Sequence, residues 1–134
     1  MVKNIVEAIQ KAETLTSGEI RVHLKYFCGK DVLREAKDQF YKLRMDRTKH
    51  HNGVLILVAL RSRRFALYGD EAIHRKVGDF FWNETRDKIA SYFSEGRIEP
   101  GIVAGVESVG EQMRKHFPSD RNDSNELSNE VTEG

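Results

Sequence analysis

The first part of the chain changes from helical to strand periodicity. Over residues 2–14 the apolar side chains recur three or four positions apart, at Val2, Ile5, Val6, Ile9 and Ala12. This spacing predicts an amphipathic helix with one buried face. From Ile20 to Tyr26, apolar residues instead alternate with polar ones. That alternation predicts a strand with one buried face and one partly exposed face.

The middle of the chain contains the longest apolar run. Asp31 can cap a second helix, whose predicted buried stripe is Val32, Leu33, Ala36, Phe40 and Leu43. Residues 54–60 are apolar without interruption, as is typical of a central strand covered on both faces. After a short turn at 61–63, residues 64–68 are predicted to return as the third strand of the fold, in a hairpin.

Three more helices are predicted after the hairpin. Residues 70–77 form a short one, and Asp79 can cap a longer one that carries Phe80, Phe81, Trp82, Ile89 and Phe93. Pro100 is predicted to lie near the start of a last helix, whose buried face is Ile102, Val106, Val109, Met113 and Phe117. Because a helix joins the first two strands, we expect them to be parallel, with the third antiparallel to the second. The pattern therefore predicts an α/β fold with a small mixed sheet flanked by helices.

Charge separates this predicted domain from the end of the chain. The net charge of the 134 residues is only +1, but residues 118–134 hold five acids and one base. That segment has few apolar residues and no periodicity, so it cannot bury enough surface to offset the entropy lost on ordering. We expect one α/β domain over residues 1–117 and an acidic disordered tail over residues 118–134.

Composition excludes several classes of protein. With 39% hydrophobic and 32% charged residues and two prolines, the chain is neither collagen-like nor wholly disordered. The longest apolar run has seven residues, against about 20 for a membrane span. The single cysteine cannot form an internal disulfide, and the N-terminal segment lacks the continuous apolar core of a secretory signal. These features favour a cytoplasmic location.

The predicted topology places oxygen-rich loops together at one edge of the sheet. The first two strands begin there and the third ends there, which gathers Glu19, Asn52, Asp70 and Glu71. Carboxylates and a carboxamide are the ligands that Ca²⁺ and Mg²⁺ prefer. The alternative is that the acids only stabilise a helix N-terminus or lie on the surface.

The opposite edge offers a different interpretation. Cys28 and Arg34 stand in a C-x5-R relation between a strand and a helix, where a thiolate and an arginine could hold a phosphate. A phosphate loop of this kind needs small residues between the two and a hydroxyl after the arginine. Here Val32 and Leu33 are predicted to be core, and Glu35 follows Arg34. A cysteine phosphatase is therefore a weaker hypothesis.

Other sequence features give weaker evidence for metal, nucleotide or nucleic-acid binding. His50 and His51 could ligate a transition metal, although adjacent histidines in a polar loop are more often solvated. No phosphate-binding P-loop and no G-x-G-x-x-G motif occurs. Basic residues cluster between Lys42 and Arg64, but Phe40 and Tyr41 fall on or beside the core stripe and offer no stacking platform, so we expect no nucleic-acid partner.

Five segments in this order resemble the TPM domain family, which is also described as phosphatase-like. They are T-S-G-E-I-R-V-H (16–23), R-T-K-H-H-N-G-V-L-I-L-V-A-L (47–60), F-A-L-Y-G-D-E-A-I-H (65–74), F-W (81–82) and the G-x-x-x-G-x-x-x-V-G stretch (101–110). The resemblance covers roughly residues 3–117. Known members include thylakoid-lumen proteins linked to photosystem repair, a receptor-modulating membrane protein and many bacterial proteins.

The resemblance implies a three-layer α/β/α sandwich, divalent-cation binding and, in some members, acid-phosphatase activity. The matching acidic and amide positions are Glu19, Asn52, Asp70 and Glu71, the same residues that the topology brings together. Ca²⁺ or Mg²⁺ is thus the expected cofactor, and any phosphatase activity would use the ion to polarise a phosphoryl oxygen. The alternative is a non-catalytic protein-interaction module with a structural cation site. Without an export signal or membrane anchor, the chain resembles a stand-alone cytoplasmic version of the family.

Overall fold

The fold is known from a computed structural model, which describes residues 1–77, 82–119 and 131–133. In these ranges the helices are α1 (Val2–Glu13), α2 (Val32–Lys42), α3 (Glu71–Val77), α4 (Asn83–Ser94) and α5 (Ile98–His116), with a 3-10 turn η1 (Met45–Arg47). The strands are β1 (Ile20–Lys25), β2 (Val54–Ala59), β3 (Arg64–Gly69) and β4 (Thr132–Glu133).

The strands form one mixed sheet in the order β3-β2-β1-β4. β1 runs parallel to β2 and to β4, and β3 runs antiparallel to β2. All six residues of β2 are buried, which confirms the prediction of a central strand. The expected parallel and antiparallel pairings of the first three strands are confirmed as well.

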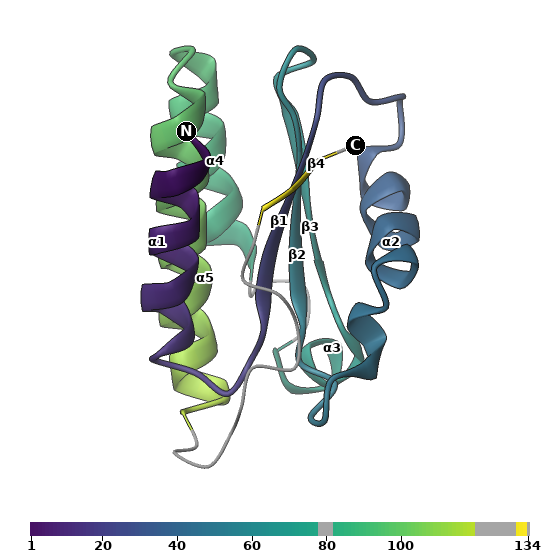
Figure 1. Cartoon of the computed structure of the whole chain (residues 1–134), viewed down its shortest axis with the longest axis vertical. Helices are drawn as coiled ribbons and strands as arrows, with labels where there is room; N and C mark the ends of the chain where they lie inside the picture. Colours follow the sequence, from purple (N-terminus) through teal and green to yellow (C-terminus); the bar gives the residue numbers. More distant parts are fainter. Residues whose placement is uncertain (78–81, 120–130, 134) are drawn as a thin grey trace.

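Helices cover both faces of the sheet, so the predicted α/β/α sandwich is confirmed. Figure 1 shows α1, α4 and α5 on one side and α2 on the other. The larger core lies on the three-helix side, where Val22, Ile56 and Leu67 of the sheet pack among apolar residues of α1, α4 and α5. On the α2 side, Ala36 packs near Leu57. Among the described residues, no helix combines the length and apolar character needed to cross a membrane.

Helix α5 packs closely against both α1 and α4 because it carries glycines at the contacts. A Cβ on Gly105 would lie 2.6 Å from the Cδ1 atom of Ile89 in α4. A Cβ on Gly110 would lie 2.8 Å from the Cβ atom of Ala12 in α1. Real Cβ contacts do not reach these distances, so the glycines set how near the helices can approach.

The structure differs from the sequence prediction at the second helix. Leu33 was predicted to belong to its buried stripe, but it is 54% exposed, because the face of α2 that packs on the sheet carries Val32 and Ala36 and Leu33 is turned away from it. The described part of the fourth helix, α4, is Asn83–Ser94. The predicted cap Asp79 and the predicted apolar residues Phe80 and Phe81 lie in 78–81, outside the described residues.

A short fourth strand was not predicted. Thr132 and Glu133 pair with His23 and Leu24 of β1, and Val131 packs against the larger core. The Nδ1 atom of His23 lies 2.8 Å from the Thr132 hydroxyl. These contacts lie inside the segment predicted as a disordered tail, and residues 120–130 of that segment lie outside the described residues.

Candidate functional site

Backbone hydrogen bonds hold the three oxygen-rich loops side by side. The backbone N–H of Val54 donates to the carbonyl of Glu19 at 2.8 Å, at the start of β1 and β2. The N–H of Asp70 donates to the carbonyl of Gly53 at 2.9 Å, where β3 ends. Register agrees, because Val54 is opposite both Ile20 and Gly69. The sheet thus brings together the backbone of Glu19, Asn52 and Asp70, as the predicted topology requires. We call this edge the acidic end.

Three of the four predicted ligand residues are buried at the acidic end. Glu19 is 5% exposed, Asn52 1% and Asp70 4%. The side-chain N–H of Asn52 donates to the Ser17 hydroxyl at 3.2 Å. One carboxylate oxygen of Asp70, Oδ1, accepts the backbone N–H of Glu71 at 2.7 Å. These bonds orient the two side chains at the junction of β3 and α3.

Two buried oxygen atoms at the acidic end have unused acceptor capacity. Among the described residues, neither Oδ1 of Asn52 nor Oδ2 of Asp70 has a hydrogen-bond partner. The Nδ1 atom of His51 lies 3.7 Å from Asp70 Oδ2, which is too far for a good hydrogen bond. Buried polar atoms in native proteins are almost always satisfied by a donor, a water or an ion. The pair therefore provides acceptors for an external ligand.

The fourth predicted ligand, Glu71, lies at the rim. Its side chain is 66% exposed, and its carboxylate is 3.9 Å from the guanidinium of Arg75 one helical turn later. Glu71 therefore lies on the surface, as the alternative interpretation of the acids expected. Within residues 1–77, 82–119 and 131–133, no group of three or more His, Cys, Asp or Glu side chains is arranged to hold a metal ion.

Aromatic rings pack together on the α2 side of the sheet, next to the acidic end. The ring of Tyr68 in β3 contacts Phe40 at 5.0 Å and His74 at 5.9 Å, both edge-on. Burial raises the pKa of Tyr68, and the neighbouring Tyr41 hydroxyl and the charge of Asp70 raise it further. The Tyr68 phenol is therefore neutral at physiological pH, so it adds no charge to the site.

The sequence analysis missed two groups near the acidic end. Glu13, at the end of α1, accepts the backbone N–H of Ile20 at 2.8 Å, although six residues lie between the two. The Thr48 hydroxyl is buried with no hydrogen-bond partner in the described part of the chain. His51 was considered as a transition-metal ligand or, more often for such a loop, as a solvated residue; the structure places it near Asp70, with a left-handed backbone at φ 51°. Only the loop geometry places these groups, and no spacing in the sequence signals them.

The opposite edge is poorly arranged for the phosphate loop considered for Cys28 and Arg34. The backbone N–H of Gly29, which a phosphate would need, donates to the carboxylate of Glu35 at 2.7 Å. A carboxylate in that place repels an anion. Arg34 is an exposed residue of α2 whose backbone N–H is capped by Asp31 at 3.0 Å. This geometry disfavours the cysteine-phosphatase hypothesis.

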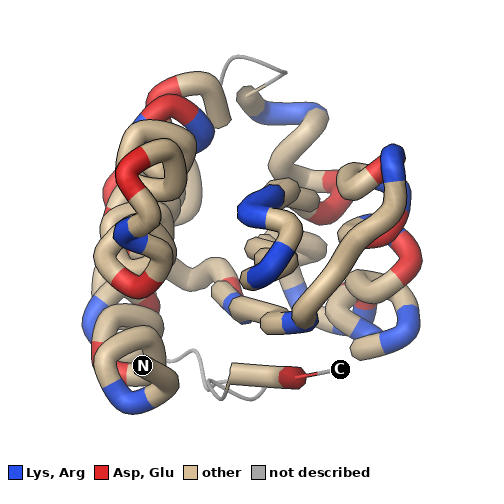
Figure 2. Tube along the Cα trace, turned by 90° about the horizontal axis from the view of Figure 1, so that it is seen from above, with Lys and Arg blue, Asp and Glu red and all other residues tan. Residues whose placement is uncertain are grey.

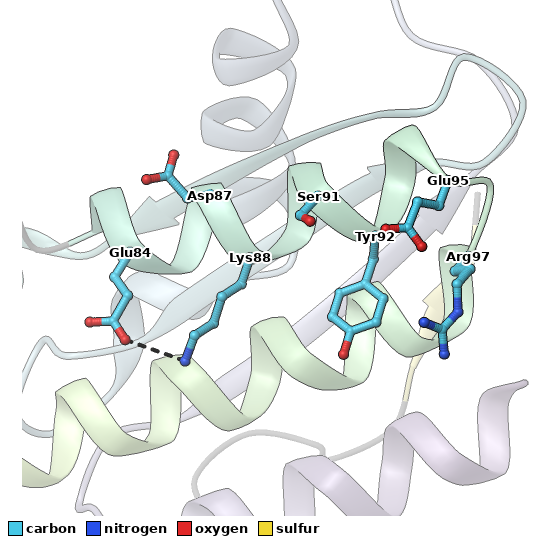
Figure 3. A pocket seen from close by; sticks show the side chains of 7 residues that line it. All are labelled: Glu84, Asp87, Lys88, Ser91, Tyr92, Glu95 and Arg97. Carbon is cyan, nitrogen blue, oxygen red and sulfur yellow. Dashed lines mark ion pairs between the residues drawn. The ribbon is translucent and has the colours of Figure 1, made fainter.

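A surface hollow on α4, which the sequence analysis did not single out, has a volume of about 720 Å³. Figure 3 shows its side chains spread along the helix, with the ion pair of Glu84 and Lys88 at 3.3 Å. The guanidinium of Arg97 lies over the ring of Tyr92, 5.1 Å from its centre. Its lining has mixed charge and is partly self-paired, so it presents no convergent set of reactive groups.

The fold and the acidic end together define an α/β sandwich domain with oxygen donors gathered at the strand ends. The sequence matches the TPM domain family over residues 2–112. The chain therefore belongs to the TPM domain family. A search of curated protein sequences finds no match.

Two solved structures are similar to this chain. The BA42 protein from the psychrophilic bacterium Bizionia argentinensis has 45% identical residues and a TM-score of 0.92, with 99% of this chain and 92% of that one covered. The N-terminal domain of the cg2496 protein from Corynebacterium glutamicum has 18% identity and a TM-score of 0.64, with 88% of this chain and 74% of that one covered. The second likeness concerns the fold alone.

Proposed function

We propose that this TPM domain binds a divalent cation, Ca²⁺ or Mg²⁺, at the acidic end. Glu19, Asn52 and Asp70 would supply the inner ligands, and Glu71 would complete the set from the rim. The observation that carries the proposal is the pair of buried acceptors without hydrogen-bond partners, Asn52 Oδ1 and Asp70 Oδ2. Their chemistry fits, because both cations prefer carboxylate and amide oxygens to softer ligands.

A cation would have an evident stabilising role here. It would offset the cost of keeping the carboxylates of Glu19 and Asp70 buried, and it would join the loops that precede β1 and β2 to the one that follows β3. With two buried carboxylates and one amide, much of the coordination would come from water or backbone carbonyls, as is usual for Mg²⁺.

Two roles for the bound ion lead to different functions. In a phosphatase, the ion would polarise a phosphoryl oxygen of the substrate, and the exposed side of the site, with His51 52% and Glu71 66% exposed, gives such a substrate access. In a non-catalytic interaction module, the ion would only brace the loops, which the burial of three ligands favours. A cytoplasmic location remains a prediction from the sequence alone.

An NMR titration of the full chain with each cation tests the binding site. We expect amide shifts to cluster at residues 18–19, 52 and 69–71 and to disappear in Asp70→Asn, which keeps the acceptor for the N–H of Glu71. Asp38→Asn removes the same charge from an exposed position of α2 and should leave the titration unchanged. Shifts centred on residues 28–34 and 61–63 would place the site at the wrong end of the sheet.

A phosphate monoester assay then separates the two roles. Turnover that requires the cation and is abolished by Asp70→Asn would exclude a purely structural ion. Cation binding at the acidic end without turnover would assign the chain to the interaction modules. Full activity of Cys28→Ser, if turnover is found, would eliminate the cysteine mechanism.

A further inference from the structure

Large apolar side chains are exposed at the end of the sheet opposite the acidic end. Phe27 is 67% exposed, Tyr26 64% and Leu33 54%. The first two follow β1, and Leu33 lies in the first turn of α2. We call residues 26–33 together with the β2–β3 turn at 61–63 the loop tip; Figure 1 shows both segments at the same end of the molecule. A cluster of exposed apolar residues on a small domain usually marks an interaction surface.

Basic residues surround these apolar side chains. Segments 25–35 and 61–64 contain six bases and two acids, and the bases are Lys25, Lys30, Arg34, Arg61, Arg63 and Arg64. The guanidinium of Arg61 lies over the Tyr26 ring, 5.9 Å from its centre, so charge and aromatic surface are adjacent. Figure 2 looks onto this end and shows Lys and Arg positions in the loops beside the sheet.

Both acids of these segments already have partners within the protein. Glu35 pairs with Lys25 at 2.9 Å, and Asp31 caps α2 through the backbone N–H of Arg34 at 3.0 Å. Glu133 of β4 lines a hollow with Tyr26, and the Arg63 guanidinium lies near Gly96, which follows Glu95 in the chain. The remaining positive charge therefore faces outward with little internal compensation.

Several backbone groups of the loop tip are hydrogen-bonded within the protein. The guanidinium of Arg64 donates to the carbonyls of Gly29 at 2.8 Å and Lys30 at 2.9 Å. The N–H of Ser62 donates to the carbonyl of Tyr26 at 3.3 Å, which ties the loop to the hairpin turn. A segment whose polar backbone groups are already paired can enter a medium of low dielectric constant at reduced cost.

We propose that the loop tip docks on an anionic lipid bilayer. Tyr26, Phe27 and Leu33 would enter the interface between headgroups and acyl chains, while Arg61 and Arg63 would contact the headgroup phosphates. Docking at the loop tip would be a function separate from cation binding, because the loop tip lies at the end of the sheet opposite the acidic end. An acidic strand of nucleic acid is a poorer partner, because the tip is a projecting turn rather than a groove, and Leu33 offers no ring for stacking.

Vesicle flotation of the full chain in EDTA tests docking without interference from the acidic end. We expect binding to vesicles of equal phosphatidylcholine and phosphatidylglycerol, weakened by salt, and none to phosphatidylcholine alone. Arg61→Ser/Arg63→Ser should lower partitioning about 30-fold, and Phe27→Ser about tenfold. Arg47→Ser/Arg114→Ser removes the same charge elsewhere and should change partitioning by less than about threefold.

A fluorescent variant tests insertion directly. Phe27→Trp should show a blue-shifted emission with anionic vesicles, whereas the native Trp82 is buried and should contribute a constant background. Tyr41→Trp places the probe at an exposed position near the C-terminal end of α2 and should not shift. The proposal fails if the chain does not float, if the two arginine pairs lose binding equally, or if it binds single-stranded DNA or an acidic peptide but not vesicles.

Discussion

At the contact between α1 and α5, a Gly→Ala substitution would change stability in two opposite ways, through overpacking and through helix propensity. In Gly110→Ala, the new methyl group would lie 2.8 Å from Cβ and 3.3 Å from Cα of Ala12. Ala12 has no side-chain torsion that could move its methyl away, so the helices must separate by roughly 0.5–1 Å to restore ordinary contact. Overpacking of this kind costs about 1–3 kcal/mol, and the gain in helix propensity returns about 1 kcal/mol. We expect a net loss of about 1 kcal/mol in the free energy of unfolding.

The double variant Ala12→Gly/Gly110→Ala moves the methyl group from one helix to the other. Ala12→Gly alone should cost about 2 kcal/mol, from lower helix propensity and the lost burial of one methyl. In the double variant the propensity changes cancel and the methyl is kept, so its stability should lie within about 1 kcal/mol of wild type. Since the single costs sum to about 3 kcal/mol, a double variant that loses about 0–1 kcal/mol gives a coupling free energy of about 2–3 kcal/mol between the two positions.

Urea denaturation measures these values, with far-UV circular dichroism and the emission of Trp82 as two probes of one transition. The m-value should stay constant across the four proteins, since the surface exposed on unfolding barely changes. If Gly110→Ala is more stable than wild type and the cycle is additive, helix propensity alone determines the change in the free energy of unfolding. The close approach of α1 and α5 is then refuted.

Three further predictions concern local contacts and use the same denaturation assay. Burial lowers the pKa of His23, and the charges of Lys25, Lys42 and Arg21 lower it further. Because the unfolded chain then binds more protons than the folded one, the free energy of unfolding should fall as the pH drops through 6.5. A His23→Gln variant that keeps this slope would contradict the assignment. Asp31→Ala removes the cap of α2 and should cost about 1 kcal/mol, whereas Asp31→Asn should cost less than half of that. Thr85→Val leaves the buried Ser108 hydroxyl without its partner at 2.6 Å and should cost about 1–3 kcal/mol. The double variant Thr85→Val/Ser108→Ala removes both hydroxyls and should partly restore stability. If it does not, the hydroxyl pair does not link α4 to α5.

Local patterns were sufficient to predict most of the fold and the position of the acidic end. The continuous apolar run became the fully buried β2, and the alternation from Ile20 became β1. Once the directions of three strands are known, their ends must meet at the same edge. That rule placed Glu19, Asn52 and Asp70 in adjacent loops. Their roles as cation ligands remain a prediction.

Features that depend on distant contacts could not be read in the same way. Leu33 has the spacing of a buried residue and is exposed, because two adjacent apolar residues at the start of the helix leave open which one faces the sheet, and the structure chooses Val32. The strand β4 is too short to have a pattern, and its place depends on the free edge of β1 and a bond between Thr132 and His23. A two-residue strand has no intrinsic preference strong enough to specify it.

By itself, the sequence determined the order and type of the main elements, the mixed sheet and the edge at which the acidic residues gather, because periodicity and chain connectivity are local properties. Only the tertiary structure decided which of those residues are buried, which oxygens lack partners and how His51 approaches Asp70. It also decided that Tyr26, Phe27 and Leu33 are exposed. Burial and hydrogen-bond satisfaction depend on what every other segment covers, and that information exists only once the layers have packed.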